Sequence, residues 1–236
     1  MIRAVFFDFY NTLSRFYPFR EELQAKACEE FGIHVTSEGI TRGYALADAH
    51  MAHEVAELPL WERDTQGRND FFAEYQRLIF QGAGKEVSLE LALKVISRVR
   101  QFSYGYALFD DVLPTLAVLK DMGFTLALLS NNDEDINKLC NDLGLFPHMD
   151  FAISAQEVGS VKPYPPIFIQ ALRRAEVEPQ ETLYVGDQYE TDVKGARGVG
   201  IHPVLLDRDV LMTDVKDCPR IEGLVELVDL VRRMGS

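Results

Sequence analysis

The chain has 236 residues, with 24 Lys and Arg against 37 Asp and Glu, which gives a formal net charge of −13. Binding to nucleic acid and electrostatic attachment to anionic lipid both rest on clustered basic side chains, so this balance argues against both functions. Hydrophobic residues make up 47% of the chain and charged residues 26%, which is typical of a folded globular protein. The length suffices for one large domain, or for a core domain that carries a smaller one.

The three cysteines, Cys28, Cys140 and Cys218, are far apart in the chain and form no CxxC pair. This spacing argues against a disulfide framework and against a thiolate zinc site, and it favours a reducing compartment. No segment approaches membrane-spanning length, since the first apolar run already stops at Asp8. We therefore expect a cytoplasmic protein with no membrane partner.

Apolar spacing predicts one strand at the start of the chain and then a long helical block. Residues 5–7 form a continuous apolar run, which is typical of a buried parallel strand. Ser88 is the predicted N-cap of the last helix in the block. The predicted helices of the block are residues 21–31, 38–57, 70–80 and 89–100.

Strands and helices alternate through the second half of the chain. The predicted strands are residues 124–129, 151–153, 182–185 and 201–206, and the predicted helices are residues 114–122, 134–143, 165–174, 192–199 and 222–233. With the first strand, this gives five apolar strands separated by helices. The order predicts an α/β fold, a Rossmann-like parallel sheet with helices on both faces. The helical block is then an insertion after the first strand.

Polar residues follow four of the predicted strands. They are Asp8, Ser130, Lys162 and Asp187. Ligands of open parallel sheets bind beyond the carboxyl ends of the strands, so we expect these side chains to converge on one pocket. Two carboxylates, a hydroxyl and an ammonium group could supply a nucleophile, an anion-binding pair and a metal ligand.

Four short motifs in this order resemble those of the haloacid dehalogenase (HAD) superfamily of hydrolases. Each motif is weak by itself, but four in order at strand ends are specific. The resemblance implies an α/β catalytic core of residues 1–14 and 106–236 and a helical cap domain of residues 15–105. The motifs are Asp8-Phe9-Tyr10-Asn11-Thr12, Leu128-Leu129-Ser130-Asn131, Val161-Lys162-Pro163-Tyr164-Pro165, and Tyr184-Val185-Gly186-Asp187 with Asp192 five residues after Asp187.

The resemblance also implies roles for individual residues. Asp8 would be the nucleophile and form an aspartyl ester intermediate. Asp8, Asp187 and the backbone carbonyl of Tyr10 would coordinate Mg²⁺, a hard cation that prefers oxygen ligands. Asp192 would be a further ligand or would orient the ligands. The expected substrate is a small anionic molecule, bound by Thr12, Ser130, Asn131 and Lys162.

Within this substrate-binding group, Ser130 and Lys162 would hold the anionic oxygens and Thr12 would support the loop. Lys162 also belongs to the expected catalytic group with Asp8 and Tyr10, because its positive charge would screen Asp8. The neighbouring Asn132 is interpreted as a cap of the helix that follows it.

Tyr10 departs from the pattern of the phosphatases in this superfamily. They carry a second Asp at this position, which protonates the leaving alcohol, whereas a phenol with an ordinary pKa near ~10 is a poor base at neutral pH. The 2-haloacid dehalogenases carry a Tyr here, because a halide leaves without a proton. Tyr10 therefore favours carbon–halogen chemistry.

Asp187 and Asp192 favour the opposite interpretation. The dehalogenases of the superfamily work without metal, and two carboxylates at a strand end are costly without a cation. We weigh this acidic pair above Tyr10 and predict a Mg²⁺-dependent phosphatase of a small phosphorylated metabolite. A metal-independent 2-haloacid dehalogenase is the close alternative, and a catalytically weak binding member is the third. A monomer and a homodimer both fit the sequence.

A second group of possible metal ligands lies in the helical block. His50 and His53 are three residues apart, and Glu54 and Glu57 are close to them on the predicted helix. Because no third ligand is evident at metal-binding spacing, we interpret this group as a solvated helix face.

Overall fold

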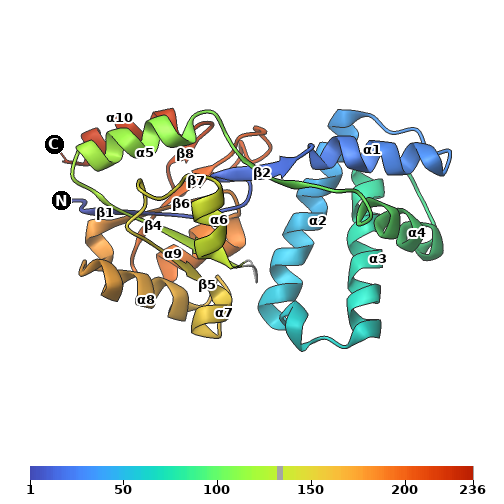
Figure 1. The fold of residues 1–236 in the computed structure, drawn as a ribbon, viewed down its shortest axis with the longest axis horizontal. Helices are drawn as coiled ribbons and strands as arrows, with labels where there is room; N and C mark the ends of the chain where they lie inside the picture. The colour runs from blue at the N-terminus through green and yellow to red at the C-terminus, as the bar shows by residue number, and fades with distance from the viewer. Residues whose placement is uncertain (132–134, 236) are drawn as a thin grey trace. The chain divides into compact units, whose positions relative to one another are not determined.

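The computed structural model of the chain describes residues 1–131 and 135–235. The chain divides into two compact units, one of Met1–Arg15 with Ala107–Ser236 and one of Phe16–Tyr106 (Figure 1). The first unit is an α/β structure and the second is helical. The roles of the first unit as catalytic core and of the second unit as cap domain stay predictions.

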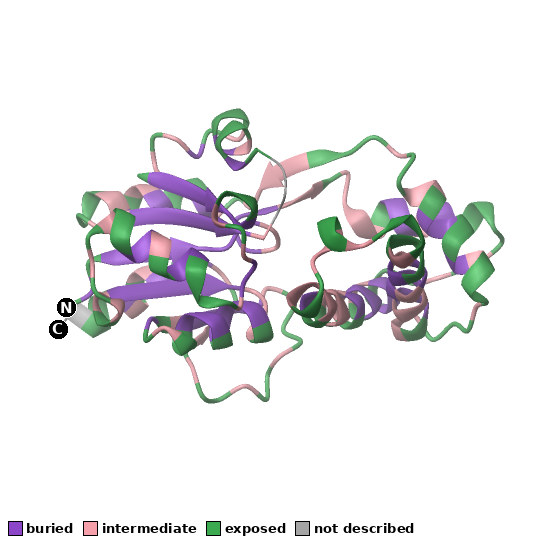
Figure 2. Ribbon diagram, turned by 90° about the horizontal axis from the view of Figure 1, so that it is seen from below, coloured by how far each residue is buried: buried purple, intermediate pink, exposed green. Residues whose placement is uncertain are grey.

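A six-stranded parallel sheet forms the centre of the first unit, in the order β5-β4-β1-β6-β7-β8. The three central strands are almost entirely buried, which explains their continuous apolar sequence (Figure 2). The strands are β1 (Ala4–Phe7), β4 (Thr125–Ser130), β5 (Phe151–Ser154), β6 (Thr182–Gly186), β7 (His202–Leu206) and β8 (Arg220–Ile221).

Helices cover both faces of this sheet, as the alternating pattern predicts (Figure 1). α5 (Val112–Asp121) and α10 (Val225–Gly235) pack together on one face. α8 (Pro165–Ala175) and α9 (Lys194–Gly198) pack on the other, over a core that includes Phe6. The shorter helices α6 (Ile136–Asp142) and α7 (Ala155–Val158) lie in the connections on either side of β5.

The second unit contains four α-helices and one 3-10 turn in its described residues: α1 (Arg20–Glu30), α2 (Ser37–Glu57), η1 (Leu60–Glu62), α3 (Thr65–Gly82) and α4 (Leu89–Val99). α2 and α3 cross closely because glycines face each other. A Cβ atom on Gly43 would lie 2.2 Å from the carbonyl oxygen of Ile79, and one on Gly82 would lie 2.3 Å from the Cα of Gly43.

Side-chain caps set the starts of these helices. Ser88 accepts a hydrogen bond from Leu91 N at the start of α4, which confirms the predicted cap. Asp64 caps α3 in the same way through Gly67 N. Because of this cap, α3 begins at Thr65. The predicted start at residue 70 is five residues too late, because the prediction followed the apolar periodicity, which begins there.

The fold class predicted from the sequence is confirmed, and several details differ. The sheet has a sixth strand, β8, whose two residues are too short to give an apolar pattern. Strands β2 (Ser14–Tyr17) and β3 (Gly105–Leu108) form a separate two-stranded sheet that the sequence analysis did not predict. The helix predicted at residues 134–143 is α6, which begins at Ile136 with Asp135 as its N-cap, and the cap proposed for Asn132 lies outside the described residues.

The helix predicted at residues 192–199 is also different. A single wide turn of π-helix, η3 (Tyr189–Val193), comes before α9, so that Asp192 belongs to the wide turn. Among the described residues, no helix is both long enough and apolar enough to cross a lipid bilayer.

Candidate active site

The central strands bring three of the predicted site residues to one edge of the sheet. β1 pairs with β4 on one side and with β6 on the other, and Phe7 is level with Leu128 and Val185. Asp8 and Asp187 directly follow their strands, and Ser130 is the last residue of β4. The backbone N–H of Asp8 donates to Val185 O at 2.9 Å, which continues the ladder into the site.

Lys162 lies at the centre of the site, and its ammonium group with the three side chains that it contacts, those of Asp8, Asp192 and Tyr184, is called the hub below. Its side chain is 2% exposed, and its Nζ donates to Asp8 Oδ1 at 2.5 Å, to Asp192 Oδ1 at 2.8 Å and to the hydroxyl of Tyr184 at 2.8 Å. Three oxygen acceptors use the three donors of an ammonium group, so the buried charge is fully hydrogen-bonded. The predicted convergence of Asp8 and Lys162 is therefore present in the structure.

The wide turn of η3 returns the carboxylate of Asp192 to this hub. The side chain of Asp192 is 2% exposed, and its Oδ2 accepts from Gln188 N at 3.0 Å while Oδ1 accepts from Lys162 and from Tyr184. Gly186 makes room for it, since a Cβ atom there would lie 2.3 Å from Asp192 Cγ. A glycine is therefore needed before Asp187, because any side chain at position 186 would overlap the carboxylate of Asp192.

Burial and mutual charge set the protonation of the hub. Burial raises the pKa of Asp8 to about 6; Lys162 opposes this rise and Asp192 adds to it. Burial by itself lowers the pKa of Lys162, but the charges of Asp192 and Asp8 outweigh burial and raise that pKa well above its ordinary value. Lys162 is therefore a permanent cation at neutral pH, and it stabilises Asp8 as a carboxylate.

Asn131 holds the backbone of Lys162. Its Nδ2 donates to Lys162 O at 3.0 Å, and its Oδ1 accepts from Lys162 N at 2.7 Å. The predicted role of Asn131 was substrate binding, and these contacts show that its amide also fixes the chain at the lysine. Ser130, beside it, is buried at the end of β4.

The loop after Asp8 turns back tightly on itself. Asn11 adopts a left-handed conformation with φ 59°, and its N–H donates to Ser14 O at 2.7 Å. The next residue, Thr12, is fully buried, and its hydroxyl donates to Asp187 Oδ1 at 3.5 Å. Thr12 therefore contacts one of the predicted metal ligands.

Tyr184 is a site residue that the sequence analysis missed. Its hydroxyl accepts from Lys162 Nζ and donates to Asp192 Oδ1 at 3.2 Å. Burial, and then the charge of Asp192, raise the pKa of this phenol well above its ordinary value, so it stays protonated. The signal was the residue type: a tyrosine inside a fully buried strand needs a partner for its hydroxyl.

Three carboxylates face one another at this edge of the sheet. Asp8, Asp187 and Asp192 each offer an oxygen, and these oxygens lie within 4.8 Å of one another. Lys162 supplies one positive charge against three negative ones, so the cluster keeps an excess of negative charge. A set of hard oxygen donors with excess negative charge fits a divalent cation such as Mg²⁺.

Comparison with known proteins agrees with this geometry. A family profile described as haloacid dehalogenase-like hydrolase matches residues 2–200. The chain belongs to the haloacid dehalogenase-like hydrolases. The predicted family, the predicted fold and the prediction of a hydrolase are thereby confirmed.

Two relatives of this HAD-like hydrolase carry phosphatase and general hydrolase names, and a solved structure with a similar fold is a dehalogenase. A glyceraldehyde 3-phosphate phosphatase of Methanopyrus kandleri is 31% identical, with 100% of both chains covered. The haloacid dehalogenase-like hydrolase domain-containing protein 3 of Homo sapiens is 29% identical over 87% of this chain and 82% of its own. The L-2-haloacid dehalogenase of Xanthobacter autotrophicus has the same fold, with a TM-score of 0.61 and 22% identity over 98% of this chain and 99% of its own.

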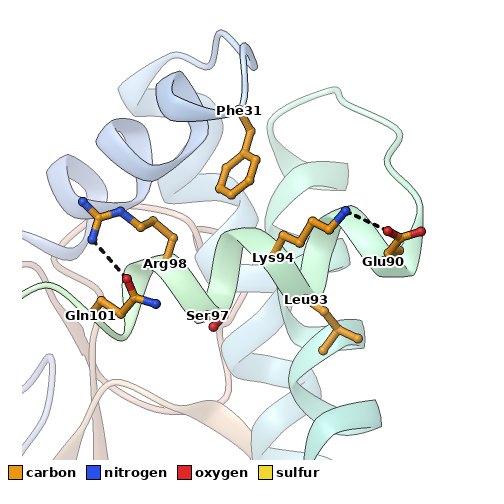
Figure 3. A pocket seen from close by; sticks show the side chains of 7 residues that line it. All are labelled: Phe31, Glu90, Leu93, Lys94, Ser97, Arg98 and Gln101. Atoms are coloured by element: carbon orange, nitrogen blue, oxygen red, sulfur yellow. Dashed lines mark hydrogen bonds and ion pairs between the residues drawn. The ribbon is translucent and has the colours of Figure 1, made fainter.

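Two other features of the HAD-like hydrolase lie in its helical unit. His53, Glu54 and Glu57 could together approach a metal ion, but the side chains of His53 and Glu57 are both 68% exposed, in line with the predicted solvated face. A cavity of about 450 Å³ lies along α4 (Figure 3), and it contains none of the predicted site residues. Its lining residues are Phe31, Glu90, Leu93, Lys94, Ser97, Arg98 and Gln101.

Proposed function

We propose that this HAD-like hydrolase is a Mg²⁺-dependent phosphatase of a small phosphorylated metabolite. The observation that carries the proposal is the buried cluster in which one ammonium group, that of Lys162, faces the carboxylates of Asp8 and Asp192, with Asp187 beside them. The phosphatase name of a relative that is 31% identical over the full length supports it. A small anionic substrate, a cytoplasmic location and a monomeric or homodimeric state belong to the same proposal.

Asp8 is the proposed nucleophile. Its carboxylate attacks phosphorus, the bond between phosphorus and the leaving oxygen breaks, and the electron pair leaves with that oxygen. Water then attacks phosphorus in the aspartyl phosphate, the bond between phosphorus and the Asp8 oxygen breaks, and inorganic phosphate and the Asp8 carboxylate are released. The proton lost by the water balances the proton taken up by the leaving oxygen. The attack needs the carboxylate, and the contact with Lys162 Nζ at 2.5 Å holds Asp8 in that form.

The metal would be held by Asp8, Asp187 and the backbone carbonyl of Tyr10. When bound, Mg²⁺ supplies positive charge to the phosphoryl oxygens and neutralises the acidic cluster. Thr12 restrains Asp187 through its hydroxyl. Ser130 is the proposed hydrogen-bond donor to the phosphoryl oxygens that do not react. Lys162, whose three donors are engaged by Asp8, Asp192 and Tyr184, would hold these oxygens through its positive charge.

Asp192 is proposed to be an orienting residue, the second of the two roles expected for it, and it would act by holding Lys162, which contacts the proposed ligand Asp8. One of its carboxylate oxygens accepts from Lys162 and Tyr184, and the other accepts from Gln188 N. Both oxygens are therefore engaged in holding the lysine and the turn. Asp187 is the better candidate for a direct ligand, because its exposure is intermediate whereas Asp192 is buried.

A 2-haloacid dehalogenase is the second candidate, and Tyr10 is the observation that favours it. The phenol of Tyr10 replaces a carboxylate that would protonate a leaving alcohol, and a halide leaves without a proton. In that reaction, Asp8 would attack carbon and the carbon–halogen bond would break with its electron pair on the halide. The excess negative charge around Asp187 and Asp192 counts against a carboxylate substrate.

One paired assay separates the two candidates. Phosphate release from p-nitrophenyl phosphate is measured with Mg²⁺ and with excess chelator, and halide release from 2-chloropropionate is measured without metal. The proposal expects Mg²⁺-dependent phosphate release that disappears in Asp8→Asn and persists in Asp142→Asn, a control whose carboxylate pairs with Lys138 on the surface. Halide release, with no phosphate release from small phosphoesters, would overturn the proposal in favour of the dehalogenase.

A further inference from the structure

We propose that Arg208 is a positioning residue of the active site. It anchors the loop that carries Tyr10 and Thr12, and through Thr12 it restrains Asp187. The part of this inference that concerns turnover rests on the proposed function, whereas the anchoring of the loop does not. Arg208 follows β7 and lies beyond residues 2–200, which the family profile matches.

The guanidinium of Arg208 bridges two segments that are far apart in the sequence. Its Nη2 donates to the backbone carbonyl of Thr12 at 3.0 Å. Its Nη1 and Nη2 also donate to the two carboxylate oxygens of Asp111, each at 3.0 Å. A bidentate arginine–carboxylate pair fixes the plane of the guanidinium, and so it fixes the direction of the bond to Thr12.

The partners of Arg208 are themselves held in place. Asp111 Oδ2 accepts from Leu224 N at 2.8 Å, which ties it to the segment before α10. The guanidinium lies over the ring of Phe109, with its carbon 3.9 Å from the ring centroid. The side chains of Arg208 and Asp111 are 17% and 19% exposed, so this ion pair is largely shielded from solvent.

This anchor stands where the chain leaves the first unit and where it returns. The first segment of the first unit ends at Arg15, shortly after Thr12 and Leu13. Its second segment begins at Ala107, shortly before Phe109 and Asp111. The backbone N–H of Phe109 donates to Leu13 O at 3.1 Å, which joins the two segments directly. Arg208 adds a side-chain bridge between the same two segments.

Thr12 passes this restraint to the site. Its carbonyl is held by Arg208, and its hydroxyl donates to Asp187 Oδ1. Tyr10, whose carbonyl is the third proposed metal ligand, lies two residues earlier in the same tight turn. Loss of the anchor should therefore let Asp187 and the Tyr10 carbonyl shift while Asp8 keeps its contact with Lys162.

Arg208→Gln tests the proposal, with Arg220→Gln as the matched control. Arg220 forms ion pairs with Asp207 and Glu222 close by, at 2.8 and 3.0 Å, and neither partner belongs to the proposed site. Amide hydrogen exchange of peptides that cover residues 9–15 is measured in both variants. Turnover and KM for p-nitrophenyl phosphate are measured at several Mg²⁺ concentrations.

The proposal expects faster exchange over residues 9–15 in Arg208→Gln but not in Arg220→Gln. It also expects turnover about 10- to 100-fold lower with KM little changed, since a misplaced group lowers the rate more than binding, and half-activation at a higher Mg²⁺ concentration. Exchange equal to that of the control, or turnover equal to that of the control, would overturn it. If Arg208→Gln does not fold, Asp111→Asn is used, with the same pattern expected in weaker form and the same results counting against it.

The two proposals fail in different ways. A wild-type protein that releases no phosphate in Mg²⁺ overturns the proposed function, and hydrogen exchange then still decides whether Arg208 anchors the loop. A wild-type phosphatase whose Arg208→Gln variant matches the control overturns only the positioning role.

Discussion

The side-chain amide of Asn131 forms two hydrogen bonds with the backbone of Lys162. Its Oδ1 accepts from Lys162 N at 2.7 Å, and its Nδ2 donates to Lys162 O at 3.0 Å. The residue after β4 therefore fixes the position of a lysine that lies 31 residues later. Because the lysine side chain is buried among three acceptors, a shift of its backbone would disturb all three contacts.

Asn131→Asp keeps the size of the side chain and replaces its donor with an acceptor. The new carboxylate would face Lys162 O, so we expect repulsion and displacement of the lysine backbone. Turnover should fall by about 10- to 100-fold, the usual cost of a small misplacement at a reacting centre. Steady-state kinetics of the variant check this, beside those of Asn141→Asp, a control at an exposed asparagine whose amide donates to Asn137 O within α6. Equal turnover in the two variants would contradict the role of Asn131.

Asp8→Asn should stabilise the protein when metal is removed by excess chelator. The folded state raises the pKa of Asp8 from 3.8 to about 6 through burial, so it holds the proton more tightly than the unfolded chain does. The stability linked to this group is therefore fully present below about pH 4 and is lost as the pH rises through about 6. The neutral amide does not suffer this loss.

Thermal unfolding in chelator measures the effect. The melting temperature of Asp8→Asn minus that of the wild type should be small near pH 4, rise between pH 4 and 6, and level off above that. Added Mg²⁺ should shrink the difference, because a cation bound to the wild type offsets the charge of Asp8. A difference that does not change with pH would show that the buried carboxylate carries no such cost.

Tyr10→Asp should raise phosphatase turnover. The new carboxyl group would supply a proton to the leaving alcohol, a contribution that is typically about 100- to 10,000-fold for a well-placed acid or base. The gain should be larger for an alkyl phosphate than for p-nitrophenyl phosphate, whose leaving group needs no proton. Turnover of both substrates is compared in the wild type, Tyr10→Asp and Tyr10→Asn. An equal gain in the amide variant would argue against proton transfer.

Gln76→Leu should stabilise the helical unit. Gln76 lies in α3 with 0% exposure, and neither Nε2 nor Oε1 has a hydrogen-bond partner in the described parts of the chain. A buried polar group without a partner costs about 1–3 kcal/mol, and an apolar side chain of similar size removes that cost. Urea unfolding should therefore show a higher midpoint.

Gln24→Leu is the matched control for this substitution. Gln24 is equally buried, but its Nε2 donates to Cys28 Sγ at 3.4 Å and its Oε1 accepts from Tyr44 OH at 3.4 Å. Its replacement should destabilise the protein, since those two groups lose a partner. Destabilisation by both substitutions would show that the amide of Gln76 is stabilising in its present environment.

Much of the first unit follows from local sequence patterns. An apolar run that stops at Asp8, or at Ser130, defines both a buried strand and the polar end of that strand. In a parallel sheet these ends meet at one edge, so the approach of Asp8 to Asp187 follows from the order of the elements. The start of α8 at Pro165, and in the second unit the start of α4 after its cap Ser88, likewise depend on residues within one turn.

Features that depend on contacts between distant segments have no local pattern in the sequence that would predict them. Strand β2 and the loop of Arg208 carry little apolar periodicity. The aromatic ring of Tyr184 fits the apolar pattern of β6, so the pattern does not distinguish it as a site residue. The wide turn at Tyr189–Val193 was also missed, since its sequence reads as an ordinary helix start. Each of these features is set by a partner that is remote in the sequence.

By itself, the sequence determined the parallel α/β sheet, the helical insertion and the set of residues at the strand ends, because periodicity and strand termination are local properties. Only the tertiary structure decided that Asp192 and Tyr184 share the ammonium group of Lys162, that Asn131 holds its backbone and that Arg208 reaches the carbonyl of Thr12. A hydrogen bond depends on distances of about 3 Å and on direction, and packing alone brings remote side chains to that precision.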